Sequence, residues 1–158
     1  MRNGSANSTS SLIFDAEKQF CMHNHFQLTN VQFEQQFQQC TLNPALFNHE
    51  AHLRLAWIHI KNYGRETAIQ NICNQLVRFT ASVGAADKYN KTLTVAAVKA
   101  VYHFMQRSSS ETFHDFITEH PRLKFNFKEL MAAHYKKDIY HSEKAKKEFL
   151  EPDLLPFD

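Results

Sequence analysis

Two histidines at the start of a predicted helix have the spacing most suggestive of a binding site in this chain. His49 and His52 lie three residues apart within the segment 47–57, and His59 follows shortly after it in the same predicted helix. Side chains three apart on a helix are neighbours, so two imidazoles at this spacing could share one metal ion or one small ligand. In the zinc motif H-E-x-x-H the histidines are four apart and the Glu acts as general base. Here the histidines are three apart, so the Glu between them does not have the register of that motif.

The helical phase predicts different surroundings for the two imidazoles. At about 100° per residue, His49 shares a sector with Leu53, Ala56 and Ile60, so we expect it to face the core, with His52 beside that sector. The positive end of the helix favours neutral imidazole, which can bind a metal or accept a hydrogen bond from a ligand. Further ligands for a divalent transition metal could come from Glu50, Asp87 or His103.

A structural interpretation is open beside this functional one. His49 could brace neighbouring helices through a buried hydrogen bond, and His52 would then be a partly exposed residue on the flank of its helix. Ten His in 158 residues make the net charge of the chain sensitive to pH between about 5 and 8, whichever interpretation holds.

A second polar cluster precedes the next strongly apolar helix. The segment 87–94 reads DKYNKTLT, in which Asn90 or Thr92 could cap that helix and its free N–H groups could hold an anion. If the two preceding helices form an antiparallel hairpin, this segment returns to the end at which His49 lies. The sequence therefore predicts a small-ligand pocket lined by His49, His52, Tyr89, Asn90 and Thr92.

The elements that must position these residues are helical. Only three Gly and four Pro occur in the chain, which argues against a turn-rich β fold. Apolar periodicity predicts an antiparallel hairpin of helices over about 48–63 and 65–83, joined at Gly64, and a buried central helix over about 92–106. We therefore expect an all-α, single-domain helical bundle of about five to seven helices.

The ends of the chain and its composition suggest where the protein functions. Residues 1–11 are polar and predict a disordered tail, followed by one helical domain over 12–158. No secretory signal and no apolar stretch of membrane-spanning length is present, and the three scattered Cys fit a reducing compartment. A cytoplasmic location without a membrane partner is expected.

The last third of the chain carries a basic bias. Residues 122–147 hold eight Lys and Arg against three Asp and Glu, interleaved with Phe125, Phe127, Tyr135 and Tyr140. This pattern could form a non-enzymatic interaction surface, for nucleic acid or for a protein. A net charge of only +2 argues against a nucleic-acid partner, and a solvated helix face is the plainer interpretation.

At these motifs the chain resembles an uncharacterised family of small bacterial all-helical proteins. The family pattern is F-x-H-x-x-H-x4-W, here 47–57, then K-Y-H-x-T-x-T, here 88–94, then a C-terminal Pro-Asp, here Pro152-Asp153. The resemblance spans roughly 45–155 and implies a helical fold with a pocket at this place, but no assigned activity. Asn90 stands where the pattern has His, which favours a polar organic ligand or a structural network over a metal.

No P-loop, nucleophile elbow, dinucleotide-binding fingerprint or CxxC pattern occurs. Catalytic residues are therefore not assigned. The sequence is compatible with three hypotheses: a helical domain that binds a small molecule, a non-enzymatic interaction domain, and a metal-dependent enzyme in which His49 and His52 are ligands.

Overall fold

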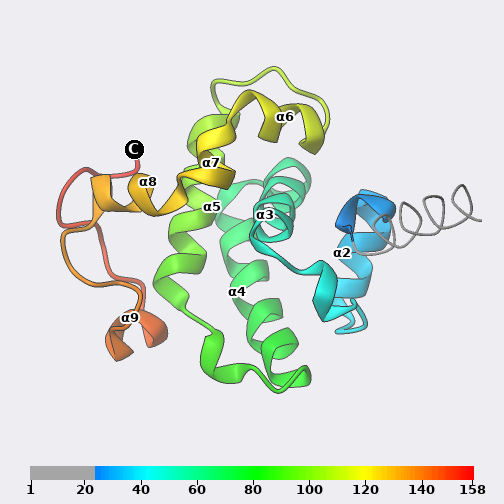
Figure 1. The fold of residues 1–158 in the computed structure, drawn as a ribbon, viewed down its shortest axis with the longest axis horizontal. Helices are drawn as coiled ribbons and strands as arrows, with labels where there is room; N and C mark the ends of the chain where they lie inside the picture. The colour runs from blue at the N-terminus through cyan, green and yellow to red at the C-terminus, as the bar shows by residue number, and fades with distance from the viewer. Residues whose placement is uncertain (1–23) are drawn as a thin grey trace, which may run out of the picture.

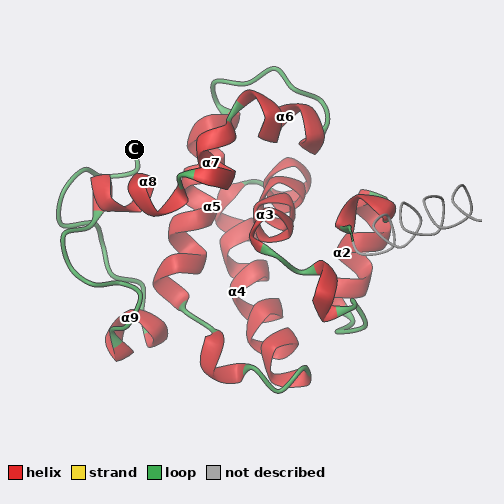
Figure 2. Cartoon of the chain, viewed as in Figure 1, coloured by secondary structure: helices red, strands yellow, loops and turns green. Residues whose placement is uncertain are grey.

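Three long helices form the centre of the molecule. The computed structural model describes residues 24–158, and in it α3 (His49–Tyr63), α4 (Arg65–Ser82) and α5 (Lys91–Met105) each pack against the other two (Figure 1). Within this described part the chain contains eight α-helices, short 3-10 turns and no strand (Figure 2). The predicted all-α bundle is therefore confirmed.

Shorter helices surround this centre. One more helix is present than the upper end of the predicted range, because Pro121 begins a separate short helix directly after the one that ends at Glu119. The predicted tail at 1–11 and the first part of the segment after it lie outside the described residues. The shorter helices are α2 (Asn30–Gln38), α6 (Phe113–Glu119), α7 (Pro121–Phe125), α8 (Phe127–His134) and α9 (Glu143–Lys147), and the 3-10 turns are η1 (His25–Gln27), η2 (Pro44–Leu46) and η3 (Ala86–Lys88).

The hairpin of α3 and α4 has the boundaries that its sequence predicts. The Asn48 side chain caps α3 by accepting a hydrogen bond from the Ala51 N–H at 2.9 Å. Gly64 is the single residue between the two helices, with φ 79° and ψ 167°. This backbone region is open almost only to glycine, because a Cβ would clash with the peptide groups. The tight reversal at Gly64 sets α3 and α4 side by side.

The most deeply buried helix is α3, although the sequence pattern indicated α5. Every residue from 53 to 60 is buried, because α2, α4, α5, α6 and α7 all pack on α3. One consequence is that the charged Arg54 and the titratable His59 are enclosed, with 4% and 0% of their surface exposed. α5 packs on α3, α4 and α9, and several of its residues keep partial exposure.

Arg54 links α3 to the segment in front of α2. Its guanidinium donates hydrogen bonds to the carbonyl oxygens of His25 and Leu28 and to Asn30 Oδ1, the last two at 2.8 and 2.9 Å. It also lies over the Phe33 ring, 5.0 Å from the ring centroid. A buried cation is tolerated here because its N–H groups meet acceptors and an aromatic face.

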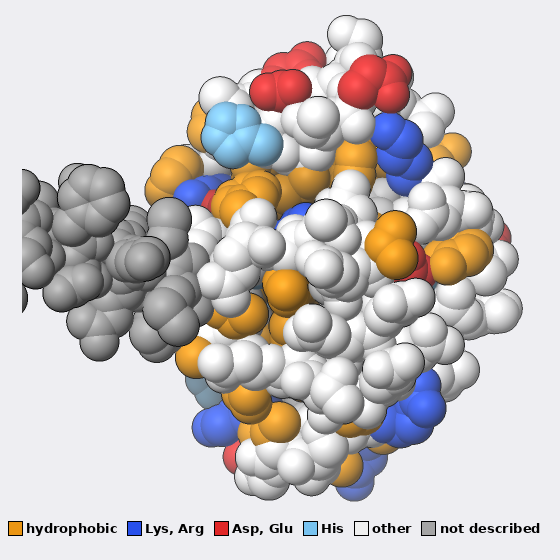
Figure 3. Space-filling model, turned by 90° about the vertical axis from the view of Figure 1, so that its right-hand side faces the viewer, with side chains coloured by type: hydrophobic (Ala, Val, Ile, Leu, Met, Phe, Trp, Pro, Cys, Tyr) orange, Lys and Arg blue, Asp and Glu red, His pale blue; other side chains and the backbone are white. Residues whose placement is uncertain are grey.

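The face that carries α2 is shown in Figure 3. Lys, Arg, Asp and Glu side chains lie mainly toward the edges of this face, and its middle is largely uncharged. Of the helices in the described part of the chain, none combines the length and apolarity that crossing a membrane requires.

Candidate functional site

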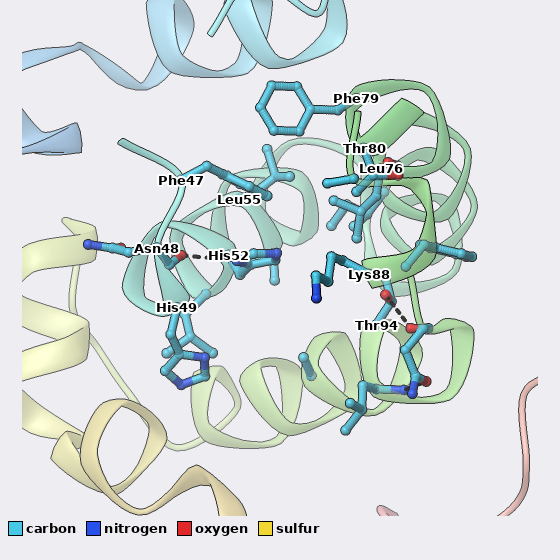
Figure 4. A pocket seen from close by; sticks show the side chains of 18 of the residues that line it. Phe47, Asn48, His49, His52, Leu55, Leu76, Phe79, Thr80, Lys88 and Thr94 are labelled. Atoms are coloured by element: carbon cyan, nitrogen blue, oxygen red, sulfur yellow. Dashed lines mark hydrogen bonds between the residues drawn. The ribbon is translucent and has the colours of Figure 1, made fainter. Parts of the chain in front are cut away.

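A cavity lies among the three central helices at the end of the hairpin that the sequence analysis indicated. Its volume is about 540 Å³, within the usual size of small-molecule sites. α3 supplies one wall and α4 and α5 the others, with the turn η3 across from α3 (Figure 4). Most of its lining is apolar: Leu53, Leu55, Ala56, Ile72, Leu76, Phe79, Val83, Leu93, Ala97, Val98 and Phe127.

Aromatic rings close one side of this cavity. Phe47, two residues before the start of α3, packs edge-on against Phe79 of α4 with 5.2 Å between ring centroids. Phe37 of α2 lies behind both rings, 4.7 Å from Phe47 and 4.8 Å from Phe79. Such contacts fix ring positions, so this wall is shaped by packing before any ligand is present.

His52 is the polar side chain that points into the cavity (Figure 4). Its Nδ1 lies 3.0 Å from the Asn48 carbonyl oxygen, and its ring lies on Phe47 with 3.9 Å between centroids. A carbonyl can only accept, so Nδ1 carries the proton and Nε2 of the neutral ring keeps a lone pair. His52 therefore offers a hydrogen-bond acceptor inside an apolar space.

The surroundings of His52 hold it in the neutral form. Desolvation by the protein around the ring lowers the pKa of His52 to about 4, although the Asn48 carbonyl acts in the opposite direction. The His52 side chain is nonetheless accessible to solvent. Both facts agree with its place on the cavity wall, where the ring has a free surface but is enclosed by protein.

His49 lines the same cavity, but it does not face the core as its helical phase suggested. The side chain is exposed, and its Nε2 lies 2.9 Å from the carbonyl oxygen of Leu123 in α7. Side chains on a helix tilt toward the N-terminus, so a residue at the first helical position extends past the end of the helix. His49 and His52 thus point in different directions (Figure 4).

The segment 87–94 contributes two of its three predicted residues to the cavity wall. Tyr89 lines it, and burial, together with the interaction of its hydroxyl with Cys73, raises the pKa of this phenol. Asn90 lines it too, and its side chain caps α5 by accepting from the Leu93 N–H at 3.0 Å and donates to the Ile139 carbonyl at 2.8 Å. The residue that departs from the family pattern is therefore part of a structural network.

Thr92 lies elsewhere than the sequence analysis expected. Its side chain is fully buried and donates to the Glu148 carbonyl at 2.7 Å, while accepting from the Leu150 N–H at 3.0 Å. It is not among the residues that line the cavity. Thr92 fastens the chain after α9 to α5.

Lys88 and Tyr140 also line the cavity, and the sequence analysis did not single them out for it. Lys88 lies within the segment 87–94, from which the sequence analysis selected Tyr89, Asn90 and Thr92. Tyr140 comes from a segment with no regular structure after α8, and its buried hydroxyl has no hydrogen-bond partner among residues 24–158. Its position depends on how the C-terminal segment packs on distant helices, which the local sequence pattern does not predict.

A second, more polar groove lies on the other side of the α3 N-terminus. Its volume is about 470 Å³, and Asn48 and His49 line both spaces. Glu50 forms an ion pair there with Lys124 and lies 3.3 Å from His25 Nε2. Its charged groups thus already have partners within the protein.

The metal hypothesis finds no complete set of ligands in residues 24–158. No group of three or more His, Cys, Asp and Glu side chains there lies in an arrangement that could hold a metal ion. His49 and His52 each commit one ring nitrogen to a main-chain carbonyl. Glu50, a suggested further ligand, is paired with Lys124.

The basic C-terminal third has most of its aromatic residues turned inward. Tyr135 is buried, and Phe127 and Tyr140 pack against the core, which leaves Phe125 exposed. A nucleic-acid surface of the stacking kind needs exposed rings beside its cations. This segment therefore uses its aromatic side chains mainly for packing.

Comparison with known protein families, with curated proteins and with solved structures found no match to this chain. The resemblance to a bacterial helical family stays a prediction from its motifs.

Proposed function

We propose that this protein binds a small organic molecule with a largely apolar body in the cavity between α3, α4 and α5. The observation that carries the proposal is the cavity itself: about 540 Å³, walled by aliphatic and aromatic side chains. Binding sites for small molecules are typically apolar spaces of this size with few polar groups. Burial of an apolar ligand here would gain about 25 cal/mol per Å² of area removed from water.

One polar group supports orientation of the ligand within this space. The lone pair on His52 Nε2 would accept a hydrogen bond from the ligand, since Nδ1 is held by the Asn48 carbonyl. The other polar lining groups are mostly committed: Thr80 and Thr94 donate to carbonyls within their own helices, and Asn90 caps α5. This arrangement fits a carrier or sensor of the ligand, and the scattered Cys of the sequence lead us to propose the cytoplasm as its place.

The test is thermal unfolding in the presence of a panel of apolar small molecules. A ligand that binds only the folded state raises Tm, and the stabilisation grows with the logarithm of its concentration once that concentration exceeds Kd. Ala97 lines the cavity, so Ala97→Phe should fill it and abolish the Tm shifts that the unchanged protein shows. Equal shifts in the two proteins, or no shift with any apolar molecule, would contradict the proposal.

A further inference from the structure

In the described part of the chain, the lining of the cavity contains a cation but no carboxylate, and this favours one class of apolar ligand. Among its described lining residues there is one Lys, Lys88, and no Asp or Glu. The side chain of Lys88 reaches from the turn η3 toward His52 on the opposite wall (Figure 4). An apolar space with a single cation at its edge favours an anion over a cation.

The main chain adds to this field. Asn48 and Asn90, the N-cap residues of α3 and α5, both line the cavity. Each helix has 15 residues, and the N-terminus of a helix carries a partial positive charge equivalent to roughly half an elementary charge. Two positive helix ends and one ammonium group thus border one apolar space.

Lys88 is available for such a ligand. Its side chain is 77% exposed, and among residues 24–158 it forms an ion pair with the neighbouring Asp87, at 3.7 Å between Nζ and Oδ2. An exposed pair of this kind contributes little to stability, so exchanging it for a ligand carboxylate costs little. Asp87 itself does not line the cavity.

We propose that the ligand is an apolar monocarboxylate, with its carboxylate beside Lys88 and its hydrocarbon part in the space between α3, α4 and α5. This inference rests on the proposed function and adds the chemical class of the ligand to it. Lys88 supplies the ion pair, the positive helix ends favour the negative charge, and the aliphatic and aromatic walls take up the rest of the molecule. His52 lies across from the carboxylate position and accepts from a ligand hydroxyl where one is present.

The experiment compares three probes that differ only in their head group: decanoate, 1-decanol and decylamine. Isothermal titration at concentrations below micelle formation should rank them in that order, with decanoate about threefold tighter than 1-decanol. That factor corresponds to about 0.6 kcal/mol, within the range of an exposed ion pair. Lys88→Met should remove the advantage of decanoate and leave the affinity for 1-decanol unchanged, which also shows that the variant is folded.

Lys144→Met is the matched control. It makes the same change of charge and size at an exposed lysine of α9 that does not line the cavity, and it should preserve the preference for decanoate. Equal binding of decanoate and 1-decanol by the unchanged protein, or a preference that survives Lys88→Met, would overturn the assignment of ligand class alone. Failure of all three probes to bind would count against the proposed function as well.

Discussion

At the scale of single residues, hydrogen bonds across long stretches of sequence decide which side chains remain available to a ligand. The sequence predicts a core-facing His49 and a flanking His52, yet one ring nitrogen of His49 is held by a carbonyl in α7, and that of His52 is held by the carbonyl of Asn48, the N-cap of its own helix. The helical phase of α3 could be predicted, but the position of Leu123 could not. This is why the predicted core-facing orientation of His49 was wrong.

Arg54 carries the residue-scale prediction for stability. Arg54→Met removes the donor for the buried His25 carbonyl and for two partly buried acceptors, the Leu28 carbonyl and Asn30 Oδ1. Unsatisfied buried acceptors cost about 1–3 kcal/mol each, so we expect a loss of about 3 kcal/mol in the free energy of unfolding. Urea denaturation measures this loss.

The control for Arg54→Met is Arg78→Met, which changes an exposed arginine on α4 and should shift the free energy of unfolding by less than about 0.5 kcal/mol. Similar losses for the two variants would show that the hydrogen bonds of Arg54 contribute nothing specific.

At the scale of helices, local signals predicted most of the architecture that bears the site. Asn48 and Asn90 each have the side chain of an N-cap, and Gly64 separates two clear apolar periodicities, so the starts of α3 and α5 and the hairpin could be found. What could not be predicted is which helix is enclosed. The burial of α3 depends on α2, α6 and α7, whose short apolar patterns do not reveal where they dock.

Gly64 gives the prediction at this scale. The combination of φ 79° and ψ 167° is nearly restricted to glycine, so Gly64→Ala should destabilise the fold by about 1–3 kcal/mol. Apart from the adjacent residues of the chain, no atom lies within 4 Å of an added Cβ, so the cost comes from the local backbone alone. Chemical denaturation gives the value.

Asn offers the sharper comparison at this turn, because it tolerates the left-handed helical region but not ψ near 167°. Gly64→Asn should therefore be as damaging as Gly64→Ala. A stability close to that of the unchanged protein for either variant would mean that the turn adopts another conformation in solution.

At the scale of the whole molecule, histidines held neutral make the fold sensitive to acid. Burial and the nearby Arg54 lower the pKa of His25 to about 4, desolvation lowers that of His52 to about 4, and burial lowers that of His59. The unfolded chain, with His near 6.5, binds more protons than the folded one between these values.

Stability should therefore be complete above about pH 6.5 and fall as the pH is lowered from there toward 4. The urea midpoint measured at several pH values tests this, and His25→Gln should reduce the slope. A midpoint that stays constant between pH 7 and 5 would contradict the account of neutral buried histidines.

The central claim is that the space between α3, α4 and α5 holds an apolar ligand, and nuclear Overhauser effects from bound probe to protein test it most directly. The probe is 1-decanol, whose binding does not depend on an ion pair because it is uncharged. We expect contacts from its chain protons to the methyl groups of Ile72, Leu76 and Val98, and the loss of these contacts in Ala97→Phe. Contacts to methyl groups outside the cavity instead, or contacts that persist in Ala97→Phe, would contradict the claim.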